Sequence, residues 1–153
     1  ARSFSIWNAA GEQVFDSGDQ LERLTAERFP LFFNASNSNN DFDTRSDDKG
    51  PEPEGVTVGK LRGRAFAFIG LERIGGVAVY DVTDPRAARY VDYINTRDFT
   101  LAPDGEATND SGAEGLAFIA AEDSPTGKPL LALGNEVSGT TTIFQIDGPG
   151  RQR

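Results

Sequence analysis

The chain of 153 residues lacks three residue types, and each absence narrows the chemistry open to it. Without cysteine it forms no disulfide framework and carries no thiolate, although this says little about the compartment in which it resides. Without histidine it has no Ser-His-Asp triad, no imidazole acid-base catalyst and none of the usual zinc ligands. Without methionine no start codon is represented, which suggests a processed or excised piece.

Long apolar runs and excess positive charge are missing as well. No stretch of 18 apolar residues occurs, so we expect neither a transmembrane segment nor a remaining signal peptide. The formal net charge of −9 argues against binding to the phosphates of a nucleic acid. The same charge fits a cation-binding surface or a highly soluble extracellular one.

What the chain does contain is an internal repeat. Glu54-Gly55-Val56 recurs as Glu114-Gly115-Leu116, an offset of 60 residues, whereas Gly70-Leu71-Glu72 recurs as Gly134-Asn135-Glu136, an offset of 64. An insertion of four residues around 123–127 explains the difference. A truncated third copy begins the chain, since residues 4–8 match residues 77–81. Self-similarity at this period is typical of blades or solenoid units that stack on one another.

The periodicity within each copy predicts short antiparallel strands. Residues 54–99 read as a complete four-stranded blade, 114–147 as three strands of the next, and 1–33 as the outer strands of a preceding blade plus a helix over 20–28 capped by Asp19. Two polar connections, 34–53 and 100–113, separate them. The predicted fold is therefore all-β, with about two and a half four-stranded blades of a larger β-propeller. Trp7 and Tyr80, at equivalent strand positions, are expected to pack between blades.

The acidic connection over residues 34–53 is the first candidate metal site. It is rich in oxygen ligands suited to Ca²⁺, at Asn39, Asp41, Asp43, Asp47 and Asp48. The spacing is not that of an EF-hand, because Phe42 stands where the turn requires glycine. The alternative is a solvated loop in which Asn and Asp make local hydrogen bonds.

Four glutamates recur in register and form a second candidate. Glu54 and Glu114 precede the innermost strand of their blades, and Glu72 and Glu136 follow the second strand. Carboxylates repeated in this way supply ligands to a metal in the channel or a paired acid and base. The alternative is structural, with each Glu-Gly capping backbone donors. Arg45 and Arg73 form a weaker candidate for anion binding, against the alternative that they pair with nearby carboxylates.

Several long motifs resemble the choice-of-anchor I family: residues 43–56 (DTRSDDKGPEPEGV), 68–76 (FIGLERIGG), 93–99 (YINTRDF), 121–125 (AEDSP) and 135–140 (NEVSGT). Its members are large secreted or surface-attached bacterial β-propellers, similar to mesenchyme-specific cell-surface glycoproteins. The resemblance covers the C-terminal part of such a propeller. It departs from the family at Ala113-Glu114-Gly115, where Gly-Pro-Glu-Gly is usual. The resemblance implies a secreted, periplasmic or cell-surface location, and members are often labelled alkaline phosphatase or phytase-like esterase.

Together these patterns favour a Ca²⁺-stabilised extracellular propeller segment that serves binding or scaffolding. The alternative is a metal-dependent phosphoesterase that uses Glu54, Glu72 and residues of the acidic loop. Because the first and last blades lack strands, their open edges are expected to pair with the rest of the propeller or with a second copy.

Overall fold

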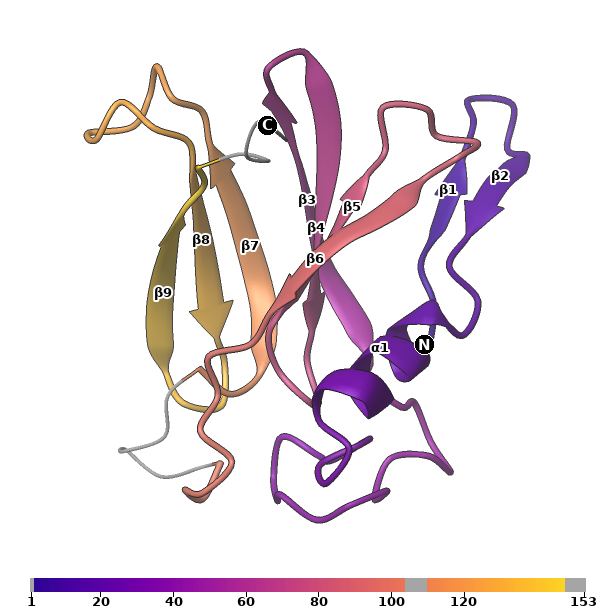
Figure 1. Cartoon of the computed structure of the whole chain (residues 1–153), viewed down its shortest axis with the longest axis vertical. Coiled ribbons are helices and arrows are strands. Elements are labelled where there is room, and N and C mark those ends of the chain that lie inside the picture. The colour runs from indigo at the N-terminus through magenta and orange to yellow at the C-terminus, as the bar shows by residue number, and fades with distance from the viewer. Residues whose placement is uncertain (1, 104–109, 148–153) are drawn as a thin grey trace.

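The computed structural model describes residues 2–103 and 110–147 and has an all-β architecture with antiparallel sheets (Figure 1). Within these two ranges, nine strands and one helix occur in the order β1 Ser5–Trp7, β2 Gln13–Asp16, α1 Gln20–Arg28, β3 Pro53–Leu61, β4 Arg64–Leu71, β5 Val77–Asp81, β6 Arg89–Ile94, β7 Ala113–Ile119, β8 Leu130–Asn135 and β9 Thr140–Gln145. The prediction of short antiparallel strands is confirmed. No helix in the described ranges is long and apolar enough to cross a membrane.

The strands form three separate sheets that lie side by side, with the largest in the middle (Figure 1). The first sheet pairs β1 with β2, the second has the order β3-β4-β5-β6, and the third has the order β7-β8-β9. Sequential strands pair throughout, as in a meander. The β3–β4 hairpin closes on Arg62 and Gly63, both with positive φ (51° and 81°), which is the geometry of a two-residue type I′ turn.

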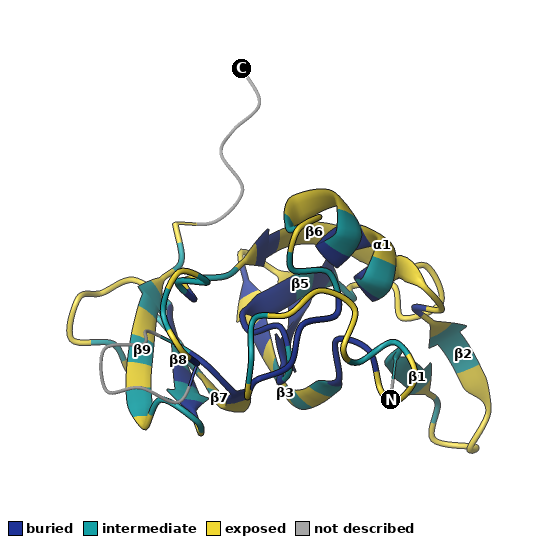
Figure 2. Ribbon diagram, turned by 90° about the horizontal axis from the view of Figure 1, so that it is seen from below, coloured by how far each residue is buried: buried dark blue, intermediate teal, exposed yellow. Residues whose placement is uncertain are grey.

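Two cores hold the sheets together, one on each face of the second sheet. One face of the second sheet packs against α1 and the first sheet through residues that include Leu21, Ile69, Leu71 and Tyr80. The opposite face packs against the third sheet through Phe66, Phe68 and Val77 with Leu131 and Leu133. Figure 2 shows the resulting pattern, in which burial is concentrated on the middle sheet and falls off toward the outer strands.

Close approach of the second and third sheets depends on glycine. A Cβ added at Gly55 would lie 1.9 Å from the carbonyl oxygen of Glu114, and one at Gly59 would lie 2.4 Å from the ring of Phe118. Any side chain at these positions would therefore force β3 away from β7. The glycine of the Glu54-Gly55 motif is thus a contact point between sheets.

Two sequence-based predictions need correction here. Asp19 does precede α1, but its carboxylate makes no cap hydrogen bond and instead accepts one from Arg23 Nε at 2.8 Å. Tyr80 is fully buried between the first and second sheets, as expected, whereas Trp7 is 60% exposed. Tyr80 is covered by Phe4, which directly precedes β1, with ring centroids 4.8 Å apart, and by Gln20 of α1, to which its hydroxyl donates at 3.2 Å.

Candidate carboxylate site

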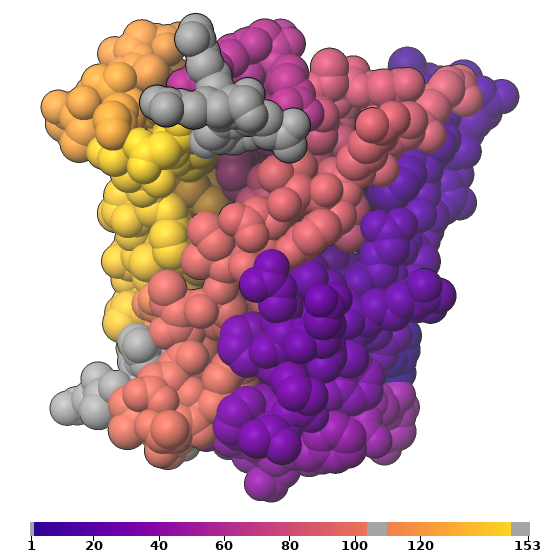
Figure 3. All heavy atoms as spheres, viewed as in Figure 1, coloured from indigo at the N-terminus to yellow at the C-terminus, as the bar shows by residue number. Residues whose placement is uncertain are grey.

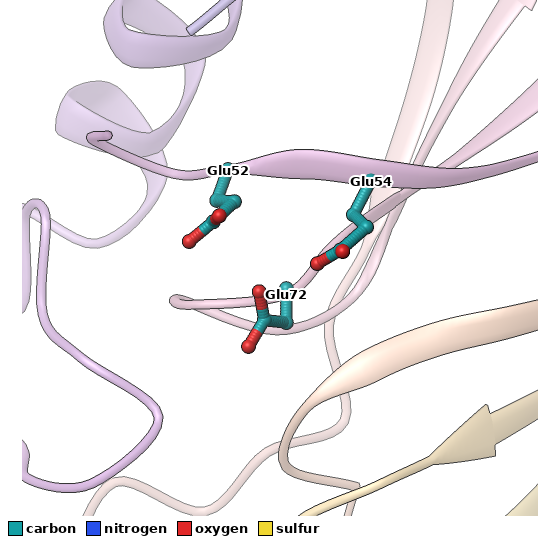
Figure 4. A group of neighbouring side chains, drawn as sticks. All are labelled: Glu52, Glu54 and Glu72. Carbon is teal, nitrogen blue, oxygen red and sulfur yellow. The ribbon is translucent and has the colours of Figure 1, made fainter. Parts of the chain in front are cut away.

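Three glutamates converge where β3 begins and β4 ends (Figure 4). Glu52 and Glu54 flank Pro53, and Glu72 directly follows Leu71, the residue that pairs with Pro53. The backbone fixes this meeting, because the amide of Glu72 donates to the carbonyl of Glu52 at 2.9 Å. One carboxylate oxygen from each of the three lies within 4.8 Å of the other two. Glu52 and Glu72 are buried, and Glu54 is exposed.

Arg73 is the main counter-charge of the group. Its Nε lies 2.5 Å from Glu52 Oε2, and its Nη1 lies 3.1 Å from Glu72 Oε1. Lys49 also pairs with Glu52. Asn37 completes the arrangement, since its Nδ2 donates to Glu72 at 2.7 Å and its Oδ1 accepts from Arg73 at 2.7 Å. Two of the three carboxylates, those of Glu52 and Glu72, therefore share one guanidinium.

The two buried carboxylates respond to this environment in opposite ways. Burial acts to raise the pKa of Glu52, but hydrogen bonds from Lys49 and Arg73 outweigh it and hold that pKa below its usual value. Burial raises the pKa of Glu72 to about 7, with a further contribution from its hydrogen bond to Glu54. Glu72 therefore binds a proton near neutral pH, and one of its carboxylate oxygens lies within 4.8 Å of one from Glu54.

The second copy of the repeat reproduces part of this geometry. The amide of Glu136 donates to the carbonyl of Gly112 at 2.8 Å, as Glu72 does to Glu52. The neighbouring Glu136 raises the pKa of Glu114, and burial and Glu54 add to the effect. However, Gly112 stands where the first copy has Glu52, and Val137 stands where it has Arg73. Only the first copy of the repeat therefore carries all three carboxylates and the arginine.

The acidic loop is organised differently from the expected ligand set. Asp41, Asp43, Asp47 and Asp48 are exposed. Within the described ranges their carboxylates do not form a group of three that approach one another closely enough for one ion. Asp48 pairs with Arg45 at 2.6 Å, and Asp43 accepts a hydrogen bond from Ser46. Asn39 accepts from the amide of Asp41 at 3.1 Å, an Asx-type turn.

A buried arginine holds the loop in place. Arg97, 6% exposed, donates to the carbonyls of Ser36 and Asn39 at 2.9 and 3.2 Å and to the side chain of Asn40 at 2.7 Å. A further bond at 2.8 Å reaches the carbonyl of Arg73. Arg97 thereby links the loop to the segment that carries Glu72. The loop also contributes to the carboxylate site, because Asn37 belongs to it.

The two arginines considered for anion binding both contact carboxylates. Arg73 is shared by Glu52 and Glu72, and Arg45 lies 2.6 Å from Asp48 and 3.8 Å from Glu52. This geometry matches the ion-pairing alternative.

The sequence-based prediction missed Glu52. No periodic signal identifies this residue, because it lies just before β3 and adopts a positive φ of 53°. The importance of Arg97 had no such signal either, because its partners lie about 60 residues away in the loop. The assembled group offers hard oxygen ligands at a partly buried position, which suits a divalent cation.

Comparison with known proteins places these features in context. The family model for the choice-of-anchor I domain matches residues 1–85. Gigasin-3a of Magallana gigas is 31% identical over 159 residues, which cover 96% of this chain and 56% of that protein. A mesenchyme-specific cell surface glycoprotein of Strongylocentrotus purpuratus is 32% identical over 78 residues, or 45% of this chain and 10% of that protein. The chain thus spans about half the length of Gigasin-3a. No solved structure matches.

Proposed function

The chain belongs to the choice-of-anchor I family, and we propose that it forms consecutive blades of a β-propeller that serves binding or scaffolding outside the cell or at its surface. The name of the sea urchin relative, a cell surface glycoprotein, supports the location. The net charge of −9 is compatible with a solvent-facing extracellular surface.

The observation that carries the propeller proposal is a contrast between two glycines of the repeat. A Cβ at Gly55 would collide with the third sheet, whereas a Cβ at Gly115, the equivalent residue of the third sheet, would meet nothing within 4 Å. The third sheet therefore repeats the docking features of the second on a face with no described neighbour. Ile143 on the same face is 54% exposed. A further sheet packed on this face would continue the series of blades.

The cation proposal moves from the acidic loop to the three glutamates. Glu52, Glu54 and Glu72 offer oxygens from opposite sides of one small space, and Asn37 fixes Glu72. A bound Ca²⁺ would displace the proton of Glu72 and offset the repulsion among the three neighbouring carboxylates, which stabilises the start of β3 against the end of β4. Ca²⁺ would thereby stabilise the end of the second sheet at which β3 begins. The contacts of Arg45 and Arg73 with carboxylates add nothing in favour of a phosphoesterase.

Thermal unfolding with EDTA and with 1 mM Ca²⁺ tests the cation proposal. The wild-type protein is expected to melt at a higher temperature in Ca²⁺, because only the folded state presents the assembled carboxylates. A double variant, E54Q/E72Q, should lose the Ca²⁺ response while remaining at least as stable as the wild type in EDTA, since a like-charge contact is gone. The matched control, D41N/D43N, should retain the full response. A response lost in the loop variant and kept in the glutamate variant would return the site to the loop.

Thiol labelling tests the propeller proposal, because the chain contains no cysteine of its own. Ile143→Cys places a thiol on the open face of the third sheet, and Ala87→Cys places one in the exposed β5–β6 turn. In the 153-residue chain both thiols should react rapidly. In a longer polypeptide that carries the proposed further blade, only the thiol at position 87 should do so. Equal labelling of both positions there would refute the stacking of a further blade.

A further inference from the structure

An apolar groove lies between β6 and β9, along the outer side of the contact between the second and third sheets. Its volume is about 430 Å³. Its lining is mostly apolar and includes Phe66, Phe68, Val79, Val91, Ile94 and Phe144. In Figure 3 the recess is visible between the pink atoms of β6 and the yellow atoms of β9. Val91 and Ile94 are 42% and 41% exposed, so this apolar surface is open to water.

The groove coincides with an unpaired strand edge. In the described part of the chain, β9 pairs with β8 on one side and with no strand on the other. The amide of Ile146 donates to the carbonyl of Pro129 at 2.9 Å, so the backbone groups of Ile146 point toward β8. In an antiparallel pair, every second residue of a strand directs its N–H and C=O groups to the partner strand, and the residues between them direct theirs away. The backbone N–H and C=O groups of Thr141, Ile143 and Gln145 consequently point to the open edge. An exposed edge of this kind is a template for another strand.

The second sheet shows what occupies the equivalent place. Strands β7, β8 and β9 correspond to β3, β4 and β5, and β5 is followed outward by β6. Ala78 pairs with Tyr93 and Tyr80 pairs with Tyr90, so both tyrosines of β6 lie on the face that packs against α1 and the first sheet. The counterparts of Ala78 and Tyr80 in the third sheet are Thr142 and Phe144, and Phe144 lines the groove. A fourth strand beside β9 would therefore direct alternate side chains into the groove.

We propose that the groove receives one β-strand, which pairs antiparallel with β9 and comes from a part of the full-length polypeptide outside these 153 residues. This inference rests on the proposed propeller. Gigasin-3a has chain beyond the matched region, since the match covers 56% of its length. Val91, Asp92 and Ile94 of β6 line the groove opposite Phe144 and Gln145 of β9, so the groove is bounded on both sides along the open edge of β9. The strand would carry apolar residues at positions i and i+2 facing Phe144.

A strand grafted onto this chain tests the inference. Val82 corresponds to Ile146, so a second copy of residues 83–95 is appended after Ile146 in place of residues 147–153. The copies of Tyr90 and Tyr93 should then fall beside Phe144 and Thr142. Amide exchange at Thr141, Ile143 and Gln145 is expected to slow by about tenfold or more, and the fluorescence of added ANS should fall. The control carries the same thirteen residues in scrambled order.

Two results would overturn the inference. One is exchange at the three β9 amides that is no slower in the graft than in the scrambled control. The other is a concentration-dependent dimer of the unmodified chain that the graft dissociates, which would identify a second copy as the occupant. The two proposals can fail independently. Thiol labelling at position 143 tests the propeller proposal through the face of the third sheet, whereas amide exchange tests the added strand through the edge of that sheet.

Discussion

Replacing the glycine of each Glu-Gly motif by alanine should give opposite outcomes at Gly55 and Gly115. The Cβ of Gly55→Ala would lie 1.9 Å from the carbonyl oxygen of Glu114 and 2.6 Å from Leu116 Cδ1. Gly55 has no positive φ, so backbone strain plays no part in the comparison. The clashing oxygen belongs to the backbone of β7 and has no rotamer through which to move. The second and third sheets must therefore separate locally by roughly 1 Å.

The cost follows from the core between those sheets. A gap of 0.5–1 Å forfeits about a quarter to a half of the dispersion energy at each contact it opens. The affected core includes Phe68, Leu131 and Leu133, all nearly inaccessible to solvent. Overpacking of this kind typically costs about 1–3 kcal/mol, and the backbone position of the clash puts Gly55→Ala near 3 kcal/mol. Since a Cβ at Gly115 meets nothing within 4 Å, Gly115→Ala should stay within about 0.5 kcal/mol of wild type.

Urea denaturation followed by far-ultraviolet circular dichroism measures both variants under the same conditions. The expected result is a clear fall in the midpoint for Gly55→Ala, a midpoint near wild type for Gly115→Ala, and equal slopes. A stability for Gly55→Ala within about 1 kcal/mol of that for Gly115→Ala would refute the close packing of β3 on β7. Equal and large losses would refute the open face of the third sheet instead.

Three further predictions concern the carboxylate site and the loop. In EDTA, the pKa of Glu72 is about 7 in the folded state against 4.5 ordinarily, so the free energy of unfolding should fall as pH rises from about 4.5 to 7. At about 1.4 kcal/mol per pKa unit, the loss is at most about 3.5 kcal/mol. Urea midpoints at pH 5 and pH 8 should therefore differ less in Glu72→Gln than in wild type, and an unchanged difference would contradict the assignment. Arg97→Lys should lower the free energy of unfolding by about 2 kcal/mol or more, because a single ammonium cannot reach the four acceptors of the guanidinium. Amide exchange in residues 34–45 should become faster in this variant, and unchanged exchange there would refute the anchoring role of Arg97. Apparent Ca²⁺ affinity, measured by calorimetry, should fall as pH drops below about 7, because the ion displaces the proton on Glu72; a pH-independent affinity would place the ion elsewhere.

The local pattern of apolar residues was sufficient to predict the strands. Alternating apolar residues predicted the strands of the second and third sheets, and the spacing of Leu21, Leu24 and Thr25 predicted α1, because both signals depend on periods fixed by backbone geometry. The repeat likewise indicated that Glu54 with Glu72, and Glu114 with Glu136, belong to matched positions. The observed Glu54–Glu72 contact joins two of those predicted residues.

Only the tertiary structure decided which copy builds a complete site. Glu52 adopts a positive φ of 53° and reaches Arg73, which follows β4, and no periodic pattern specifies such a contact. The same holds for Arg97, whose acceptors are carbonyls of a loop without periodicity. Trp7 and Tyr80 share a position in the repeat but differ in burial, since burial depends on the sheet that lies opposite. The sequence by itself thus determined the strands and their repetition through short-range geometry, whereas packing between distant segments determined where charge is concentrated and which faces remain open.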